Sequence, residues 1–447
     1  MGKGKFNEQA SVDYYKTSKE IISYWDTNNI FEKSIKSRPK DKIFPFYEGP
    51  PSANGMPGIH HVMARTIKDI FCRYKTLKGY RVYRKGGWDT HGLPVELQVE
   101  KNLGITKDDI GDKISVEKYN EECKVAVMQF KEAWEDLTES IGYWLDIDDA
   151  YVTFKNNYIE SVWWSLKELY KKGLLYKGYT IQPFSPAAGT GLSSHELNMP
   201  GAYKNIKDTS LTAQFKIQKN KKSQDIIGDN DCYFLAWTTT PWTLPANNGL
   251  AVGEKITYNL IETFNKYTEK KINVIIAEKC IEKFFDSNNL KISEELIFDK
   301  QNLPYKILKS FQGKDIVGFD YDQLLPYVKA EKPAFTVVSG NFVTTEEGTG
   351  IVHISLTFGS DDFHVSKKNN LPGIFVKNDK NEDVPIVDRS GKFVDEIIDF
   401  AGLQVKLFSD EEGLTTDEKI AIKLKQENKA FEVKKYEHSY PHCWRTD

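Results

Sequence analysis

The feature that most constrains the fold is a Gly- and Pro-rich stretch, residues 46–61, which separates an apolar strand signal from an amphipathic helix signal. The strand signal covers 41–47 and the helix signal covers 62–77. The stretch ends in His60 and His61, at the expected first turn of the helix. Free backbone N–H groups and the positive end of the helix dipole meet at such a turn, which suits a phosphate. Taken alone, the stretch favours an ordinary strand-to-helix loop.

Strand and helix signals alternate along about the first 180 residues. A second strand is expected at 80–84. Apolar residues recur at helical spacing in four further segments, which are 11–28, a segment beginning near Pro94, 115–142 and 158–172. Strands that alternate with helices are typical of a parallel α/β sheet, so we expect one in this part of the chain.

The pattern changes after about residue 200, where short β-rich runs recur between turn-rich and lysine-rich connections. The runs are 211–215, 233–238, 274–277, 334–338 and 350–355. They predict an inserted all-β or α+β domain, which we expect to be barrel-like. A helix at 415–428 and a strand at 431–434 then return to the first pattern.

A chain of 447 residues is too long to fold around one hydrophobic core, so we expect two or three domains. We expect three parts, 1–200, an inserted domain at 201–410 and a return to the first domain at 411–447. The sequence ends without a helix cap, a charged tail or a turn signal. We therefore expect the chain to be cut inside a longer protein.

Composition is that of a soluble globular protein, with 40% hydrophobic and 28% charged residues. A net charge of −3 argues against a globally basic nucleic-acid binder. No apolar run approaches membrane-spanning length. The five cysteines are scattered and form no Cys-x-x-Cys pair, which favours a reducing cytoplasm over a disulfide framework or a zinc ribbon.

Four motifs together identify a family. They are GPPSANG at 49–55, GWDTHGLP at 87–94, WTTTPWTLPAN at 237–247 and YPHCWR at 440–445. The first two resemble class I aminoacyl-tRNA synthetases of the isoleucine, valine and leucine group. The last two resemble the isoleucine enzymes within that group. The resemblance covers the whole chain.

The resemblance implies a Rossmann-type parallel nucleotide-binding core interrupted by an editing insertion. It implies ATP-dependent activation of isoleucine, transfer to isoleucine tRNA, and hydrolytic editing of mischarged valyl-tRNA. ATP would be a substrate with Mg²⁺, and isoleucine and tRNA would be the other partners of a cytoplasmic, non-membrane protein that we expect to be monomeric. The family's second ATP signature, Lys-Met-Ser-Lys-Ser, is absent from these residues. A valyl-tRNA synthetase and a freestanding editing or tRNA-binding protein are the alternatives.

The catalytic signature departs from the family pattern. The family carries His-x-Gly-His at the start of the helix, whereas this chain carries Gly58-Ile59-His60-His61. The resemblance places a phosphate contact at His61. Either His60 replaces the missing histidine from a shifted position or His61 acts alone. We expect an active variant, and an inactive remnant is the alternative.

Five further residues are predicted to bind substrate in the same domain. Asp89 follows Trp88 at a strand's C-terminal end, where open α/β sheets bind ligands. By resemblance, Asp89 pairs with the ammonium group of isoleucine; a helix N-cap is the structural alternative. The remaining four lie in the first motif and are Glu48, Gly49, Pro50 and Asn54.

An editing site is needed because one methylene separates isoleucine from valine by only about 1–3 kcal/mol. The threonines Thr238, Thr239 and Thr240 supply hydroxyls for a water and the terminal ribose, and Trp242 and Asn247 would shape the pocket. A β-branched strand is the alternative for the threonines.

The second half of the predicted editing site lies more than a hundred residues later. By resemblance, Asp362 holds the aminoacyl ammonium group and His353 borders the side chain or the ester. Threonines with a histidine and an aspartate suit hydrolysis by a bound water, because no Gly-x-Ser-x-Gly elbow accompanies them. A satisfied core histidine is the alternative for His353. The usual Ala-Pro after this histidine is here Ser355-Leu356.

No metal site is predicted. Many relatives bind zinc through Cys-x-x-Cys pairs, but the region around Ser185 has no cysteine and Cys443 stands alone. A tetrahedral zinc needs four ligands, so we expect no structural zinc in this chain.

Overall fold

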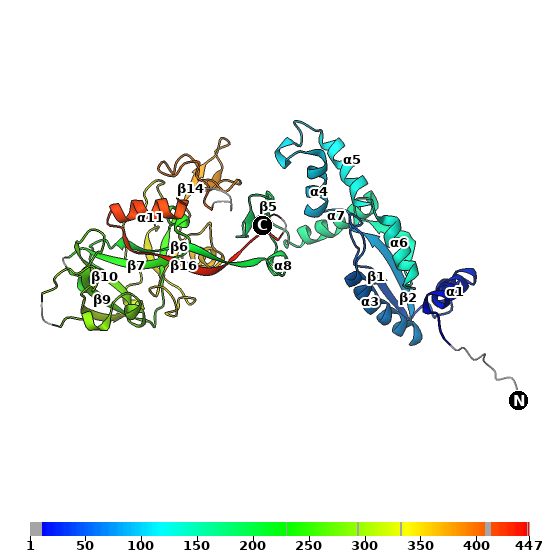
Figure 1. The fold of residues 1–447 in the computed structure, drawn as a ribbon, viewed down its shortest axis with the longest axis horizontal. Coiled ribbons are helices and arrows are strands. Elements are labelled where there is room, and N and C mark those ends of the chain that lie inside the picture. The colour runs from blue at the N-terminus through cyan, green and yellow to red at the C-terminus, as the bar shows by residue number, and fades with distance from the viewer. Residues whose placement is uncertain are drawn as a thin grey trace, which may run out of the picture. The chain divides into compact units, whose positions relative to one another are not determined.

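The computed structural model describes residues 11–228, 230–292, 295–330, 333–406, 413–444 and 446. The chain divides into two compact units, Met1–Lys177 and Gly178–Asp447, which are described separately (Figure 1). None of the helices described is long and apolar enough to cross a membrane.

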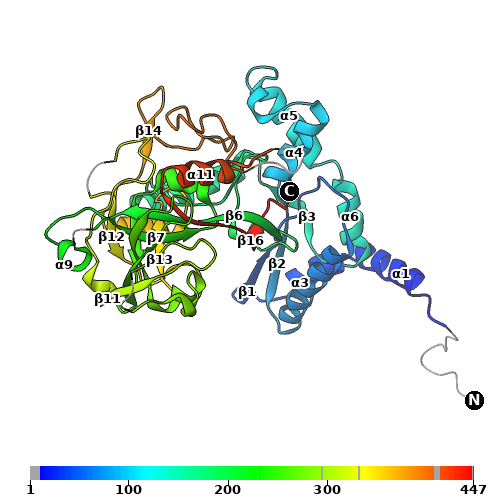
Figure 2. The ribbon, with the colours of Figure 1, turned by 60° about the vertical axis from the view of Figure 1, so that its left-hand side comes forward.

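The first unit is built on a three-stranded parallel sheet in the order β1-β2-β3. The strands are Ile43–Tyr47 (β1), Arg81–Trp88 (β2) and Asp146–Val152 (β3). Helix α3, Ile59–Leu77, connects the parallel strands β1 and β2 and lies beside them (Figures 1 and 2). The predicted parallel α/β arrangement is confirmed for this unit.

The remaining helices of the first unit lie before, between and after these strands along the chain. They are α1 (Tyr14–Thr27), α2 (Ile30–Lys36), α4 (Leu93–Leu103), the 3₁₀ turn η1 (Lys107–Asp109), α5 (Val116–Val127), α6 (Lys131–Ser140) and α7 (Asn156–Lys171). The segment 115–142, predicted as one helix, is two. At the break, the Phe130 N–H donates to the Ala53 carbonyl at 2.9 Å instead of continuing the helix. The Trp134 indole donates to the Gly55 carbonyl at 2.8 Å, so α6 is held against the Gly/Pro-rich loop.

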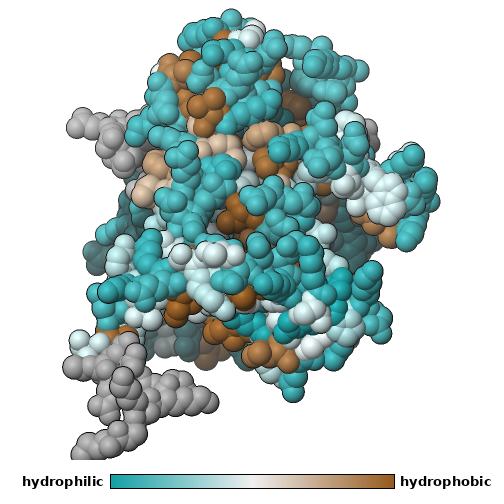
Figure 3. Space-filling view, turned by 90° about the vertical axis from the view of Figure 1, so that its right-hand side faces the viewer, coloured by the Kyte–Doolittle hydropathy of each residue, from teal (hydrophilic) through white to brown (hydrophobic). Residues whose placement is uncertain are grey.

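Helix α3 presents its apolar residues outward. Its buried side chains are Arg65, Cys72 and Thr76. Its exposed apolar residues recur at helical spacing and are Ile59, Met63, Ile67, Ile70, Phe71, Tyr74 and Leu77. Figure 3 shows one face of the molecule, on which apolar patches lie among mostly hydrophilic side chains. The polar side of α3 therefore packs toward the interior of the unit.

The second unit contains a six-stranded sheet in the order β11-β9-β10-β7-β6-β16 and a three-stranded sheet in the order β12-β8-β13. The strands of the large sheet are β6 (Tyr203–Lys216), β7 (Cys232–Thr238), β9 (Thr257–Phe264), β10 (Lys271–Ala277), β11 (Lys306–Gln312) and β16 (Ala430–Pro441). Those of the small sheet are β8 (Gly249–Val252), β12 (Thr336–Ser339) and β13 (Ile351–Ile354). Among the residues described, β11 and β16 are the edge strands of the large sheet and do not pair with each other, so a closed barrel is not confirmed.

Short elements complete the second unit. The helices are α8 (Ser194–Leu197), α9 (Gln224–Ile227), α10 (Ser360–Lys368) and α11 (Thr416–Gln426), and the 3₁₀ turns are η2 (Pro241–Ala246), η3 (Glu278–Lys283), η4 (Ser287–Asn289) and η5 (Gly313–Asp315). The strand pairs are β4 (Phe184–Ser185) with β5 (Thr190–Gly191), and β14 (Phe375–Lys377) with β15 (Asp383–Pro385). The larger apolar core of this unit includes residues of both sheets, with Phe215, Phe234, Tyr258 and Tyr321 fully buried.

Strand β16 pairs antiparallel with β6 from Ala430 to Pro441, well beyond the four residues predicted as a strand. The predicted boundary between 410 and 411 lies outside the described residues, as does Arg445 of the last motif. The three-part division stays a prediction.

Candidate functional sites

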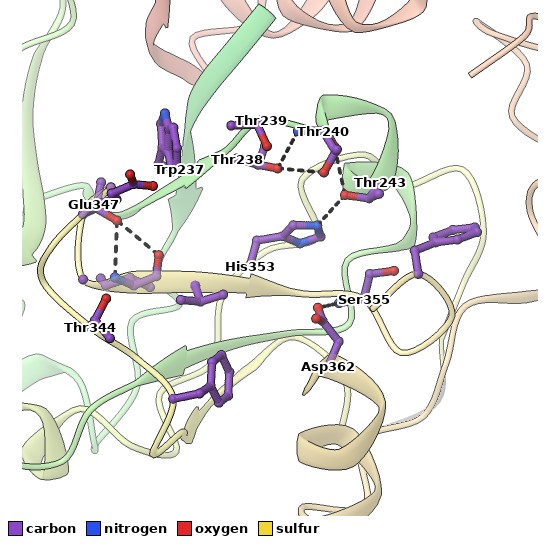
Figure 4. Close-up of a pocket in the computed structure, with 17 residues that line it drawn as sticks. Trp237, Thr238, Thr239, Thr240, Thr243, Thr344, Glu347, His353, Ser355 and Asp362 are labelled. Atoms are coloured by element: carbon purple, nitrogen blue, oxygen red, sulfur yellow. Dashed lines mark hydrogen bonds between the residues drawn. The ribbon is translucent and has the colours of Figure 1, made fainter. Parts of the chain in front are cut away.

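A cavity of about 330 Å³ in the second unit brings together most of the predicted editing residues (Figure 4). It is lined by Thr238, Thr239, Thr240, His353 and Asp362, among others. Chain topology explains this convergence. Strand β7 ends at the threonines, η2 leads on into β8, and β13 pairs antiparallel with β8 so that His353 faces this turn.

The threonine segment is an ordered turn. The Thr238 hydroxyl accepts the Thr240 N–H at 3.0 Å and lies 3.2 Å from the Thr240 hydroxyl. Thr243, which the sequence analysis did not single out, donates its hydroxyl to the Thr240 carbonyl at 2.9 Å. Local hydrogen bonds therefore fix the threonines in a turn at the end of β7, so they are more than β-branched residues of a strand.

His353 is buried, and both of its ring nitrogens are occupied by protein groups. Nε2 lies 2.9 Å from the Thr243 hydroxyl, and Nδ1 lies 2.9 Å from the Asn247 amide nitrogen. The Tyr321 hydroxyl donates to Asn247 Oδ1 at 2.7 Å, which directs the amide N–H₂ toward His353. Nδ1 is thus the acceptor and Nε2 carries the proton, an assignment made from this hydrogen-bond network.

The electrostatics of His353 agree with this geometry. Burial lowers the pKa of His353 to about 4, so the ring is neutral at neutral pH. A histidine whose two nitrogens are both satisfied has no lone pair left to accept a proton from water. His353 therefore positions the turn through Thr243, and the geometry gives it no role as a general base.

Asp362 is the third residue of α10 and lies on the opposite side of the cavity from the threonines (Figure 4). Its Oδ1 accepts the Ser355 N–H at 2.7 Å, and a Cβ at Gly359 would come within 2.2 Å of Oδ2. Burial raises the pKa of Asp362 to about 6, so the carboxylate is ionised at neutral pH. It forms no ion pair with any described residue, and an ammonium group is the natural partner for such a carboxylate.

Trp242 and Asn247 support the cavity from behind its wall and do not line it. The Trp242 ring meets Phe358, which does line the cavity, edge to face at 5.0 Å. The backbone N–H of Trp242 donates to Asp417 Oδ1 at 2.8 Å. Asp417, buried at the start of α11, was missed because no motif marks a residue 175 positions away.

Two glycines, Gly348 and Gly350, also line the cavity. Gly350 has φ +74°, and a Cβ there would lie 2.4 Å from the Cβ of Ala277. Only glycine combines this left-handed backbone with so close an approach. The neighbouring Glu347 lines the cavity, and the Tyr436 hydroxyl on β16 donates to its carboxylate at 3.1 Å.

A second cavity, of about 440 Å³, lies in the first unit. Its lining includes the predicted residues Glu48, Gly49, Pro50, Asn54 and His61. His60 and Asp89 are not among the lining residues, whereas Arg65, Lys68 and Trp134, which the sequence analysis did not predict, are.

The exchanged histidine signature has a compact local geometry. The Gly58 N–H donates to His61 Nδ1 at 2.9 Å, which leaves Nε2 of the neutral ring as a donor. The pKa of His61 is lowered by burial first, and then by His60 and Arg65. His60 is exposed, and its ring lies against that of His61 in a tilted arrangement, with ring centroids 3.8 Å apart and an interplanar angle of 44°. A Cβ at residue 58 would lie 2.9 Å from the His60 ring, so Gly58 makes room for this ring.

Glu48 is almost fully buried, and protein groups already hold its carboxylate. Lys68 lies 2.6 Å from Oε1, and the Tyr143 hydroxyl donates to Oε2. Asn54 donates to Gln98 at 3.4 Å. Asp89 is half-buried and accepts the His91 N–H at 3.3 Å, and its own N–H is bound to the Pro51 carbonyl. Asp89 therefore links the end of β2 to the Gly/Pro-rich loop.

Within the part of the chain that the structure describes, no three His, Cys, Asp or Glu side chains gather where they could hold a metal ion. The expected absence of zinc stays a prediction.

Comparison with known proteins decides the family. Residues 20–288 match the model of the class I tRNA synthetases (I, L, M and V). The chain belongs to this class. It is 57% identical over 458 residues to an isoleucine–tRNA ligase of Cytophaga hutchinsonii, covering 99% of this chain and 41% of that protein. It is 51% identical over 465 residues to an isoleucine–tRNA ligase of Bacteroides fragilis, covering 99% of this chain and 40% of that protein.

The predicted family of this class I synthetase chain is thereby confirmed. The chain spans about 40% of the length of these relatives. Among solved structures, a leucyl-tRNA synthetase of Agrobacterium radiobacter in a ternary complex matches at a TM-score of 0.31 and 15% identity, covering 60% of this chain and 41% of that one.

Proposed function

We propose that the chain is part of an isoleucine–tRNA ligase, which activates isoleucine with ATP and Mg²⁺ and transfers it to isoleucine tRNA. The second unit would contain an inserted editing domain that hydrolyses mischarged valyl-tRNA. The similarity to isoleucine–tRNA ligases along nearly the whole chain supports the first part. The cavity in the second unit supports the second part.

The observation that carries the editing proposal is the meeting of the threonine turn with Asp362 across one cavity. The carboxylate of Asp362 would hold the aminoacyl ammonium group, and the threonine hydroxyls would bind the terminal ribose and a water. That water would attack the ester carbonyl carbon, the ester C–O bond would break, and the ribose hydroxyl would leave with the proton. The neutral, fully bonded His353 favours this water route over a nucleophile activated by histidine.

The cavity in the first unit fits the activation step. The isoleucine carboxylate would attack the α-phosphate of ATP and expel pyrophosphate, a reaction that gathers negative charge. The Nε2–H of His61 and the N-terminus of α3 supply donors beside this cavity. Asp89 would bind the isoleucine ammonium group near the end of β2. His60 lies outside the lining, so His61 is the histidine that we assign to the phosphates.

The editing proposal is tested by measuring how fast the protein hydrolyses valine from isoleucine tRNA that has been mischarged with valine. The wild-type chain is compared with Asp362→Ala and with the control Asp361→Ala, which removes the exposed neighbouring carboxylate. We expect the first variant to lose activity about ten-fold or more, because one charge-assisted contact to the substrate is removed. The control should keep most of its activity. Equal rates for Asp362→Ala and wild type would refute the assignment.

A further inference from the structure

Arg65 is a buried arginine whose charge lacks a partner in the free protein. Its exposed fraction is 4%, and it lies one helical turn after His61 on the inward face of α3. Its side chain donates one hydrogen bond, to the Thr138 hydroxyl, and the rest of its five N–H donors have no partner among the described residues. The guanidinium packs over the ring of Trp134 at 5.0 Å.

The other charges around this cavity are already paired. Lys68 and Glu48 form an ion pair at 2.6 Å, and Glu48 also accepts the Tyr143 hydroxyl. No carboxylate lies within 4 Å of Arg65 in the part of the chain that the structure describes. The cavity therefore carries one unbalanced positive charge on its wall.

Arg84 on β2 provides the comparison. It is as deeply buried as Arg65, and its Nε has no hydrogen-bond partner. It nevertheless forms an ion pair with Asp69 at 3.2 Å and a hydrogen bond with Thr76, and it does not line the cavity. A buried ion without its partner is strongly destabilising. Burial lowers the pKa of both arginines, so the ion pair, and not the pKa, is what distinguishes them. An anion that binds beside Arg65 would supply the counter-charge that the free protein lacks.

We propose that Arg65 is a binding residue of this cavity for a phosphate group, and that the group belongs to the triphosphate of ATP or the pyrophosphate product. This rests on the activation reaction proposed above. Phosphate is favoured over the isoleucine carboxylate by position. Arg65 shares the cavity with His61 and the first turn of α3, where anions bind. Asp89, which would mark the amino-acid end, is not part of the lining.

The unpaired charge predicts an unusual combination of effects. Replacing Arg65 with methionine should leave the thermal stability of the free chain unchanged or higher, because an uncompensated buried charge is removed and the contact with Trp134 is largely kept. The same variant should bind pyrophosphate about ten-fold more weakly or worse, because a charge-assisted contact is lost. An arginine with a merely structural role would lower stability and leave affinity unchanged.

The experiment uses the full 447-residue chain. Pyrophosphate and ATP are titrated into wild type, Arg65→Met, Arg65→Lys and the control Arg84→Met, and tryptophan fluorescence is followed because Trp134 lies under the Arg65 guanidinium. Thermal unfolding is measured with and without pyrophosphate, which should raise the Tm of wild type and of Arg84→Met but not of Arg65→Met. Arg65→Lys should recover part of the affinity, because lysine binds phosphate as a point charge.

Three outcomes overturn the proposal. One is equal pyrophosphate affinity of wild type and Arg65→Met. Another is a fall in the Tm of free Arg65→Met similar to that of Arg84→Met. The third is a rise in Tm that depends on Arg65 and is caused by isoleucine but not by pyrophosphate. This result would assign Arg65 to the amino-acid carboxylate. If wild type binds neither ATP nor pyrophosphate, the assignment of this cavity to phosphate fails as a whole, and this result is distinct from a failure at Arg65 alone.

Discussion

Protonation of His353 should weaken the second unit at acidic pH. The folded-state pKa is about 4, whereas the unperturbed value is 6.5. The unfolded chain therefore binds a proton at this residue more readily than the folded chain, and the free energy of unfolding falls as the pH falls from 6.5 toward 4. Between about pH 7.5 and about pH 5, linkage gives a loss of about 2 kcal/mol from this residue.

Asp362 opposes this effect in the wild type. Its folded-state pKa is raised to about 6, so it contributes stability at low pH that is lost as the pH rises through that value. The two contributions overlap in the same pH window and partly cancel. The change that isolates His353 is therefore His353→Gln, which keeps polar atoms in the site but cannot take up the proton.

The assay is urea unfolding at both pH values, followed by hydrogen exchange in peptides that contain β13, so that only the second unit is monitored. The stability difference between wild type and His353→Gln should shrink by about 2 kcal/mol from the higher pH to the lower. A difference that stays constant over this range would show that His353 titrates normally, and the argument for a buried, neutral ring would fail.

Three further changes test the same site. Gly350→Ala should destabilise the second unit by about 1–3 kcal/mol more than Gly402→Ala, because both have positive φ but only Gly350 has a close neighbour; equal urea midpoints would contradict this. Asp417→Ala should lower valyl-tRNA deacylation about ten-fold by releasing the backbone N–H of Trp242, whereas Asp417→Asn keeps an acceptor and most of the activity. A similar loss of activity in both variants would instead implicate the charge of Asp417. Deacylation should also fall below about pH 6 as Asp362 becomes protonated, and a rate that is flat down to pH 4 would show that no ionisation near pH 6 controls deacylation.

The exchanged signature shows how two positions depend on each other. The ring of His60 folds back over residue 58, where any Cβ would meet it at 2.9 Å. Glycine at 58 and histidine at 60 are therefore compatible as a pair, whereas a side chain at residue 58 would require the His60 ring to move. The role of His60 itself stays a prediction, because its side chain is exposed and does not line the cavity.

Local patterns predicted most elements of the fold because hydrophobic spacing is a local property. The helix expected at 62–77 is α3, and the strands expected at 41–47 and 233–238 are β1 and β7. Two features were not predicted by local patterns. The helix break before α6 depends on a backbone hydrogen bond to Ala53, some seventy residues earlier, and the inward face of α3 is its polar one. Both depend on neighbours that sequence spacing does not reveal.

The sequence by itself determined the family and the chemical groups of both sites, because ordered motifs place glycines, histidines, threonines and aspartates at fixed positions along the chain. Only the tertiary structure decided what those groups can do. It placed Asp362 unpaired across the cavity from the threonines and satisfied both nitrogens of His353. It also left Arg65 buried without a counter-ion. Protonation, pairing and burial depend on distances between residues far apart in sequence, and folding sets those distances.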